Sequence, residues 1–228
     1  MDFSQIIFVG ITNHEDHNWR VKMADIEKLG ISEAALFLEQ IPEKAERQEV
    51  YKALEKSCVK KIPLVHIRNE MDSDELELLC SRYNNPCLTI HEDTFACLDK
   101  WRDFQKNLFL EMNFDGLVPD FVKVEKIGGF CVDLAHFKAG EEKWSDEFLY
   151  TLSKQKHHKY FACNHVSGYS YEKNKDVHRI TDLKQFDYLK TLPKFLFSQI
   201  IAIETHNSIA EQLEFKKYLI RLLNQYFL

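Results

Sequence analysis

Several features that often classify a protein from its sequence are scarce in this chain of 228 residues. There are only 7 glycines and 5 prolines, so long flexible linkers and low-complexity segments are not expected. No apolar run reaches the roughly 18 to 20 residues that a membrane-spanning helix needs. The N-terminal sequence MDFSQIIFVG also lacks the basic start of a signal peptide. These absences predict a cytoplasmic protein with no membrane segment.

An excess of positive charge and closely paired cysteines are missing as well. The chain carries 30 Lys and Arg against 36 Asp and Glu, which gives a formal net charge of −6. Broad, unspecific nucleic-acid binding needs a basic surface, so that class is disfavoured, although a local basic groove stays open. The six cysteines include no CxxC pair. This pattern indicates a reduced cytosolic protein without a disulfide framework.

What the sequence does contain is an alternation of short apolar runs with charged stretches of helical spacing. The runs lie near residues 6–12, 35–39, 62–67, 87–91, 107–112, 128–133, 159–165 and 199–204. Continuous apolar strands separated by helices indicate a parallel sheet. Eight such units predict an α/β fold, a single (β/α)8 TIM barrel that forms one domain over residues 1–228. An open doubly wound sheet is the alternative, but FVGITNHEDHNW after the first strand is not a GxGxxG phosphate loop.

The charged stretches also contain signals for the ends of helices. Leu76 lies on the apolar face of a predicted helix in DELELLCSRY, and Asp72 or Ser73 is expected to cap it. Thr181 is expected to cap a later helix. A further apolar face with helical spacing begins at Ile209.

Potential metal ligands recur at the ends of the apolar runs. In PLVHIRN, CLTIHED, LFLEMN, GFCVDLAH, FACNHVSG and IIAIETHN, an acid or an imidazole stands at or near the end of the run. A parallel barrel gathers the C-terminal ends of its strands around one mouth, so these groups should converge. Carboxylates such as Glu111 and Glu204 are costly after apolar runs unless they are paired or bind a metal. The predicted divalent-metal ligands are His66, His91, Glu111, Asp133, His136, His165, Asp176, His178 and Glu204.

Two short spacings contribute to this set. Asp133 and His136 can face one cavity after their strand, and Asp176 and His178 fall on one side of an extended segment. Each spacing alone also fits a plainer alternative, a capping aspartate with a surface histidine in one case and a solvated charged loop in the other. Ligand types at six successive strand ends favour the metal interpretation. Glu39, at the end of ALFLEQ, could reach the same mouth.

The order of these ligands resembles that of the xylose-isomerase-like TIM-barrel superfamily, which includes sugar isomerases, epimerases and endonuclease IV. In the epimerase branch, Glu, Asp, His and Glu from strands five to eight hold one metal. The residues that match this order are Glu111, Asp133, His165 and Glu204. In the endonuclease IV branch, the set reads His, His, Glu, Asp, His, His, Asp, His, Glu and holds three zinc ions. All nine positions match in type and order, so by its ligand set the chain is most similar to endonuclease IV.

The resemblance implies a metal-dependent enzyme that hydrolyses a phosphoester. Several metals suit this reaction because together they bind the phosphate, lower the pKa of a water and neutralise the leaving alkoxide. Imidazole-rich sites favour Zn²⁺, here up to three ions, with Mn²⁺ or Fe²⁺ possible. Glu111, Glu204 and Asp176 are the catalytic candidates, and in the resembling enzyme Glu111 would bridge two zincs. His66 and His91 would serve one metal.

Two other functions stay open. A sugar or sugar-phosphate isomerase or epimerase would need one metal, with Glu111 and Glu204 as proton shuttles. A barrel that binds a metal or a sugar without catalysis is the third hypothesis. Metal stoichiometry separates the hydrolase from the isomerase, because about three ions per chain favour the hydrolase and one favours the isomerase.

Residues near the predicted mouth bear on the substrate. Arg68 and Arg179 are candidate anion contacts, and Tyr169 could stack on a base or sugar or merely roof the barrel. Arg68 and Asn69 stand where endonuclease IV places an aromatic wedge, and the loop MNFDGLVPDF that begins after Glu111 is short. With the acidic balance of the chain, these departures make a small phosphorylated or sugar substrate as credible as abasic-site DNA. No obligate protein partner is indicated.

Overall fold

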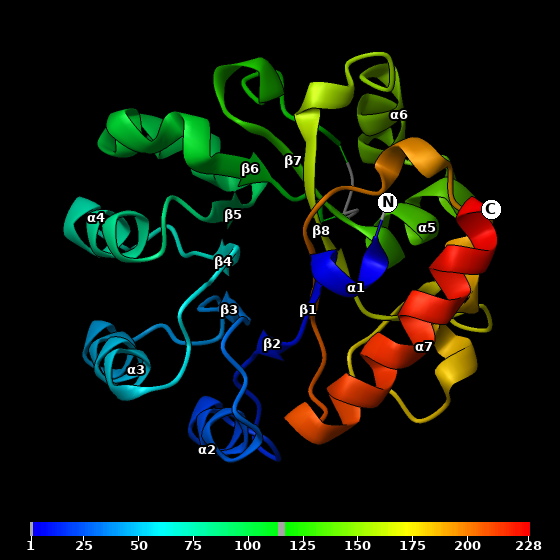
Figure 1. Ribbon diagram of the computed structural model, residues 1–228. Helices are drawn as coiled ribbons and strands as arrows, with labels where there is room; N and C mark the ends of the chain where they lie inside the picture. The colour runs from blue at the N-terminus through cyan, green and yellow to red at the C-terminus, as the bar shows by residue number, and fades with distance from the viewer. Residues whose placement is uncertain (1, 114–116) are drawn as a thin grey trace.

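A computed structural model describes residues 2–113 and 117–228, and its central feature is a ring of nine short parallel strands (Figure 1). Their order in the sheet is β1 (Ile7–Phe8), β11 (Ile201–Ile203), β8 (Phe161–Val166), β7 (Gly129–Asp133), β6 (Leu108–Leu110), β5 (Cys87–Ile90), β4 (Leu64–His66), β3 (Ala35–Phe37) and β2 (Gly10–Ile11). The two ends of this order, β1 and β2, are separated along the chain only by Val9. The sheet therefore forms a nearly closed barrel, which confirms the TIM-barrel prediction and excludes the open doubly wound sheet.

The seam of the barrel lies at this split first strand. β1 pairs with β11, whereas β2 pairs with β3. The Gly10 amide N–H donates to Gln212 Oε1 at 2.7 Å, and Gln212 Nε2 donates to the Gly10 carbonyl at 3.1 Å. A Cβ atom at Gly10 would stand 2.1 Å from the Ile203 carbonyl oxygen. Only glycine therefore lets the first strand approach β11 this closely.

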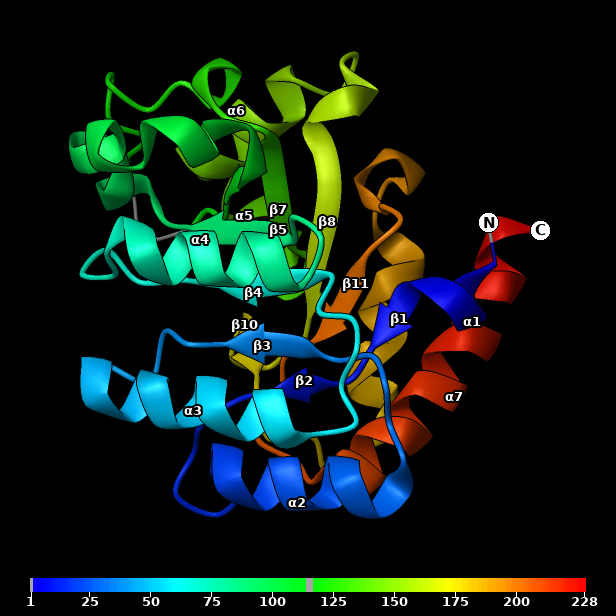
Figure 2. The same cartoon turned by 60° about the vertical axis from the view of Figure 1, so that its left-hand side comes forward.

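Helices surround the sheet in both views (Figures 1 and 2). The α-helices are α1 (Phe3–Ile6), α2 (Trp19–Leu29), α3 (Lys44–Lys56), α4 (Ser73–Arg82), α5 (Leu134–Lys143), α6 (Asp146–Ser153) and α7 (Ile209–Phe227). The 3₁₀ segments are η1 (Glu92–Asn107), η2 (Val124–Lys126), η3 (His158–Tyr160), η4 (Leu183–Thr191) and η5 (Lys194–Leu196). The chain termini lie side by side, where the rings of Phe3 and Phe227 meet at 5.1 Å. Among the described residues, no helix is long and apolar enough to cross a membrane.

Local signals in the sequence position several of these elements. Asp72 caps α4 as expected, because its side chain accepts from the Glu75 amide. The cap of η4 is Asp182 rather than Thr181, since Asp182 forms a reciprocal capping box with Gln185. An antiparallel hairpin of β9 (Gly168–Ser170) and β10 (Lys175–Val177) occupies the long connection after β8. Part of the loop after Glu111, residues 114–116, lies outside the described residues.

Apolar side chains fill two spaces. The larger cluster joins the helices to the outer face of the sheet, and it includes Phe3, Ile26, Trp101 and Leu219. A smaller cluster is made mainly of strand residues, namely Ala35, Phe37, Leu64, Phe109, Cys131, Cys163 and Ala202. All six cysteines are free. The polar groups of the strand ends therefore stand next to an apolar barrel interior.

Candidate metal centre

The strand ends bring the predicted ligands to one mouth of the barrel. Strands or the residues that directly follow them supply His66 (β4), His91 (β5), Glu111 (β6), Asp133 (β7), His165 (β8) and Glu204 (β11). The helix α5 and the hairpin strand β10 with its next residue supply His136, Asp176 and His178. These nine side chains and Glu39 fall into three groups, and within each group one ligand atom per residue lies within 4.8 Å of the others.

The central group is deeply buried and rich in carboxylates. It consists of Glu111, Asp133, His165 and Glu204, whose exposed fractions do not exceed 5%. His165 Nδ1 lies 3.1 Å from Glu111 Oε2 and 3.2 Å from Glu204 Oε2. Three buried carboxylates this close together repel one another and lose their hydration. A cation among them would offset both costs.

The first group lies beside the central one and contains Glu39, His66 and His91. His66 Nε2 lies 3.6 Å from Glu39 Oε2 and 2.9 Å from Glu111 Oε2. The Glu111 oxygen that contacts His66 is also the one nearest to His165. Glu111 therefore links the first group to the central group.

The rim group is half-buried and consists of His136, Asp176 and His178. Asp176 Oδ2 lies 2.8 Å from His178 Nε2, and Asp176 Oδ1 lies 3.9 Å from His136 Nε2. The other ring nitrogen of His136, Nδ1, lies 3.8 Å from Glu111 Oε1 and 3.9 Å from Asp133 Oδ2. The three groups thus form one continuous cluster around Glu111.

Unsatisfied polar atoms indicate that the cluster fits a cation. One oxygen of Asp133, Oδ1, caps α5 by accepting from the Ala135 and His136 amides, both at 2.8 Å. The other oxygen, Oδ2, is buried and has no hydrogen-bond partner among the described residues, and His91 Nδ1 is in the same situation. The alternative interpretation of Asp133 as a helix cap is therefore correct for one oxygen only. Its other oxygen faces the rest of the cluster. Buried polar atoms without partners are rare, and imidazole with carboxylate donors suits zinc, manganese or iron.

The charges of the cluster are strongly coupled. Burial opposes protonation of His66, but the Glu39 and Glu111 carboxylates raise its pKa to about 9. Burial would raise the pKa of Glu204, but the His165 imidazole lowers it to about 2. Without a cation, protonated imidazoles therefore balance the carboxylates. A metal ion must displace these protons when it binds.

The rim group shows the same balance nearer to solvent. The hydrogen bond from His178 lowers the pKa of Asp176 to about 2. Burial opposes protonation of His178, but Asp176 raises the pKa of that imidazole to about 10. Asp176 is therefore a carboxylate throughout the neutral range.

The predicted substrate contacts lie in different surroundings. Arg68 donates to both carboxylate oxygens of Glu70 at 3.1 Å and to the Glu39 carbonyl, beside a hollow of about 290 Å³ at the first group. Tyr169 is 3% exposed, and its ring packs against Tyr171 and Tyr188. The ring at the surface is that of Tyr171, which is 59% exposed.

The third predicted substrate contact, Arg179, is exposed and lines a second hollow of about 540 Å³. Asp176 and His178 of the rim group line the same hollow, together with Lys173 and Lys175. The surface next to the rim group therefore carries three cationic side chains within one hollow.

Two features near the mouth have neighbours that the sequence does not show, although His206 is expected near the ligands because it follows Glu204 by two residues. The imidazole of His206 stacks on those of His14 and His178, with ring centroids 4.0 Å and 5.3 Å apart. Lys22 is fully buried, and its Nζ donates to Thr12 Oγ1 and to the Thr205 carbonyl. The neighbours of these side chains become visible only in the folded barrel. In the sequence, the spacing around Lys22 is that of an ordinary amphipathic helix.

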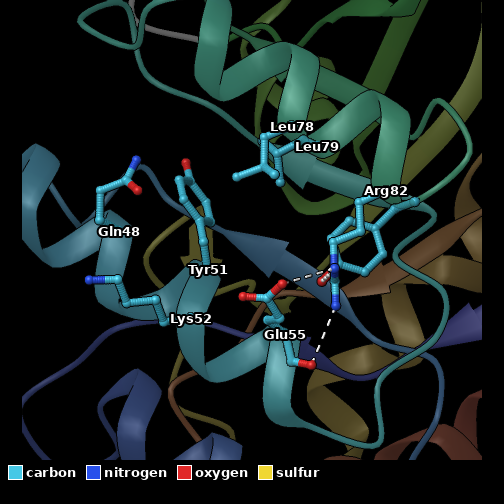
Figure 3. Close-up of a pocket in the computed structure, with 8 residues that line it drawn as sticks. Gln48, Tyr51, Lys52, Glu55, Leu78, Leu79 and Arg82 are labelled. Atoms are coloured by element: carbon cyan, nitrogen blue, oxygen red, sulfur yellow. Dashed lines mark hydrogen bonds and ion pairs between the residues drawn. The ribbon is translucent and has the colours of Figure 1, made fainter.

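A further hollow of about 230 Å³ lies between α3 and α4 on the outer layer (Figure 3). Tyr51 and Leu79 contribute to its wall, and Arg82 pairs there with the Glu55 carboxylate at 3.5 Å. None of the ten residues of the three groups lines it. The metal-capable cluster and this outer hollow are therefore separate features.

Comparisons with known proteins found a likeness in structure rather than in sequence. No protein-family model matches the chain, and no curated protein matches it. The solved structures that resemble it include endonuclease IV from Thermus thermophilus, with 12% sequence identity and a TM-score of 0.49, over 95% of this chain and 99% of that chain.

Proposed function

We propose that this chain is a divalent-metal-dependent phosphoester hydrolase with more than one metal ion. One observation carries the proposal, the convergence of three metal-capable groups on a single mouth with Glu111 between them. A single-metal reaction has no use for the first group and the rim group as ligands. When bound, divalent ions would polarise the phosphate, favour ionisation of a water and stabilise the leaving oxygen.

The side chains of the mouth have distinct roles in this proposal. Glu111 is held as a carboxylate by His165 and His66, which lower its pKa well below the ordinary value against the effect of burial. It can orient the attacking water and accept a hydrogen bond from it. Glu204 stays ionised beside His165. Asp176 fixes His178 through the 2.8 Å contact and presents its second oxygen to the mouth.

The hollow at the rim group favours an anionic substrate of modest size. Lys173, Lys175 and Arg179 line it, with Glu172 and Asp176 as the acidic members, and cationic side chains next to a metal group attract phosphate. Arg68, the other predicted anion contact, is already paired with Glu70. The cationic side chains that this proposal uses therefore lie in one hollow, which suits a small phosphodiester or phosphomonoester, whereas a long DNA duplex needs basic contacts along several phosphates.

A one-metal sugar isomerase or epimerase is the second candidate. It is favoured by the central group, because Glu111, Asp133, His165 and Glu204 alone would complete a metal site. Such an enzyme would use Glu111 and Glu204 to move a proton between neighbouring carbons of a sugar. It leaves Asp176 and His178 without a role.

The proposal is tested by hydrolysis assays on purified protein with and without a chelator. The substrates are abasic-site DNA and a chromogenic small phosphodiester, and a ketose–aldose interconversion assay serves the alternative. We expect chelator-sensitive cleavage of the small phosphodiester and at least about a 100-fold loss of turnover in Asp176→Ala. Asp103→Ala, the same change at an exposed outer position, should keep full turnover. Full activity in Asp176→Ala, or sugar interconversion without phosphoester cleavage, would exclude the hydrolase.

A further inference from the structure

The first group contains one carboxylate more than the ligand order of the endonuclease IV branch supplies. Glu39 follows β3 by two residues, and its Oε2 lies 3.6 Å from His66 Nε2. Glu111 Oε2 lies 2.9 Å from the same nitrogen. Donor atoms around a zinc ion with bonds of about 2.0 to 2.1 Å are separated by roughly 3.3 Å. Both contacts therefore lie near the spacing of ligands that share one ion.

The neighbours of Glu39 leave its carboxylate directed at the group. The guanidinium of Arg68 donates to the Glu39 backbone carbonyl, while its ion pair is with Glu70. Gln40 Nε2 donates to Glu39 Oε1 at 3.4 Å, and Oε2 is the oxygen that faces His66. The Arg68 guanidinium is thus engaged by another carboxylate. The ion pair recorded for the Glu39 carboxylate is the one with His66, inside the first group.

The rim group differs in the number of protein donors once Glu111 is counted. Glu111 Oε2 lies 2.9 Å from His66 Nε2 and makes a fourth donor of the first group. At the rim, Glu111 approaches only Nδ1 of His136, whereas Nε2 faces Asp176. His136, Asp176 and His178 therefore supply three ligand atoms, and the hollow with Lys173 and Lys175 opens beside them. Protein metal sites with four protein ligands are usually structural, whereas sites with three keep a position for water or substrate. The number of protein donors therefore predicts a closed site at the first group and an open site at the rim group.

We propose that Glu39 is a metal ligand that closes the first group. Glu39, His66, His91 and the shared Glu111 then surround the first ion, which has a structural role. The rim group keeps the open position, and the phosphate of the substrate binds there. This inference rests on the proposed multi-metal function and adds a division of roles between its sites.

The test is a titration of metal-free protein with Zn²⁺ in competition with a chelating indicator. Wild type should take up three ions. In Glu39→Gln, two ions should bind as before and the affinity for the third should fall by at least about 100-fold. Glu39→Asp, which keeps a carboxylate on a shorter stem, should lose less. Asp93→Asn is the control, because Asp93 lines the same hollow without belonging to a metal-capable group and contacts Asn69 rather than Arg68, and it should bind like wild type.

Two results would overturn the inference in distinguishable ways. Three tightly bound ions in Glu39→Gln would show that Glu39 is no ligand while leaving the proposed function intact. A single ion in wild type would instead contradict the proposed function itself. Inorganic phosphate added to the Co²⁺-loaded protein tests the open position separately. The phosphate-induced change in the visible spectrum should persist in Glu39→Gln and disappear in Asp176→Ala, and the reverse pattern would place the open position at the first group.

Discussion

At the scale of single residues, the barrel mouth brings buried charges together that would be unstable alone. Lys22 is the clearest case outside the three groups, because its ammonium is fully buried between Thr12 and the Thr205 carbonyl. Burial lowers its pKa to about 7, even though Glu211 works in the opposite direction. Lys22 ties the loop after β2 to the loop after β11, where Glu204 lies.

The pKa of Lys22 gives stability a defined pH dependence. In the unfolded chain this amine has its ordinary value of 10.5, so between about pH 7 and 10.5 the unfolded state binds more protons. The free energy of unfolding should therefore rise with pH across this window, by at most about 1.4 kcal/mol per pH unit from this group. Lys22→Met removes the group. We predict that wild type gains stability relative to Lys22→Met as pH rises, measured by urea unfolding of metal-free protein.

The control for this prediction is Lys28→Met in the same helix. Lys28 is exposed, so its substitution should shift stability by a similar small amount at every pH. A constant stability difference between wild type and Lys22→Met from about pH 7 to about pH 9.5 would mean that Lys22 is not the source of the dependence.

At the scale of secondary-structure elements, the seam between β1 and β2 depends on one side chain of α7. Gln212 is fully buried and satisfies both the amide and the carbonyl of Gly10. Its Nε2 also donates to the Asn207 carbonyl at 3.2 Å, just before α7 begins. The C-terminal helix therefore completes the hydrogen bonding that the split strand lacks.

Gln212→Leu should destabilise the barrel strongly. The change introduces an apolar side chain of similar size and removes the partner of both backbone groups of Gly10 and the Gln212 hydrogen bond to the Asn207 carbonyl. A buried polar group that loses its partner costs about 1 to 3 kcal/mol, so we predict a loss of at least about 2 kcal/mol in the free energy of unfolding in urea. Gln48→Leu, at the half-buried wall of the hollow between α3 and α4 (Figure 3), should change it by less than about 0.5 kcal/mol. Equal effects of the two variants would show that the seam does not need Gln212.

The positions of most strands and of several helix ends could be predicted from the sequence. The nine barrel strands coincide with the apolar runs, with only Val166 of β8 beyond them, because a strand buried on both faces has to be continuously apolar. The hairpin strands β9 and β10 lie outside the runs. The split at Val9 could not be predicted, since IIFVGI is continuously apolar and the hydrogen bonds of the neighbouring Gly10 depend on Gln212, some 200 residues later. The cap at Asp182 instead of Thr181 was missed because both residue types suit a cap, and only the Gln185 side chain decides between them.

At the scale of the whole molecule, the parallel barrel turns a linear order of ligands into a compact cluster. That the nine residues converge could be predicted, because all strands of such a barrel point to one mouth. Their division into three groups could not, since it depends on side-chain directions. The burial of Tyr169 could not be predicted either, because the sequence does not show that its ring packs against Tyr188 while Tyr171 faces solvent.

The position of Glu111 between the three groups leads to a prediction about the metal content of the whole site. Its carboxylate contacts His66 of the first group and His165 of the central group, and it approaches His136 of the rim group. Glu111→Ala should therefore lose more metal than a variant of a residue in one group, such as His91→Ala. Equal losses would show that Glu111 does not link the groups.

The central claim is that several metal ions share this mouth, and elemental analysis of the purified protein tests it most directly. Metal content per chain is measured for wild type, His66→Ala and His91→Ala, with protein concentration determined independently. We predict more than one ion per chain in wild type, up to three, and a decrease in both variants. One ion per chain that is unchanged in His66→Ala and His91→Ala would contradict the account and favour the one-metal isomerase.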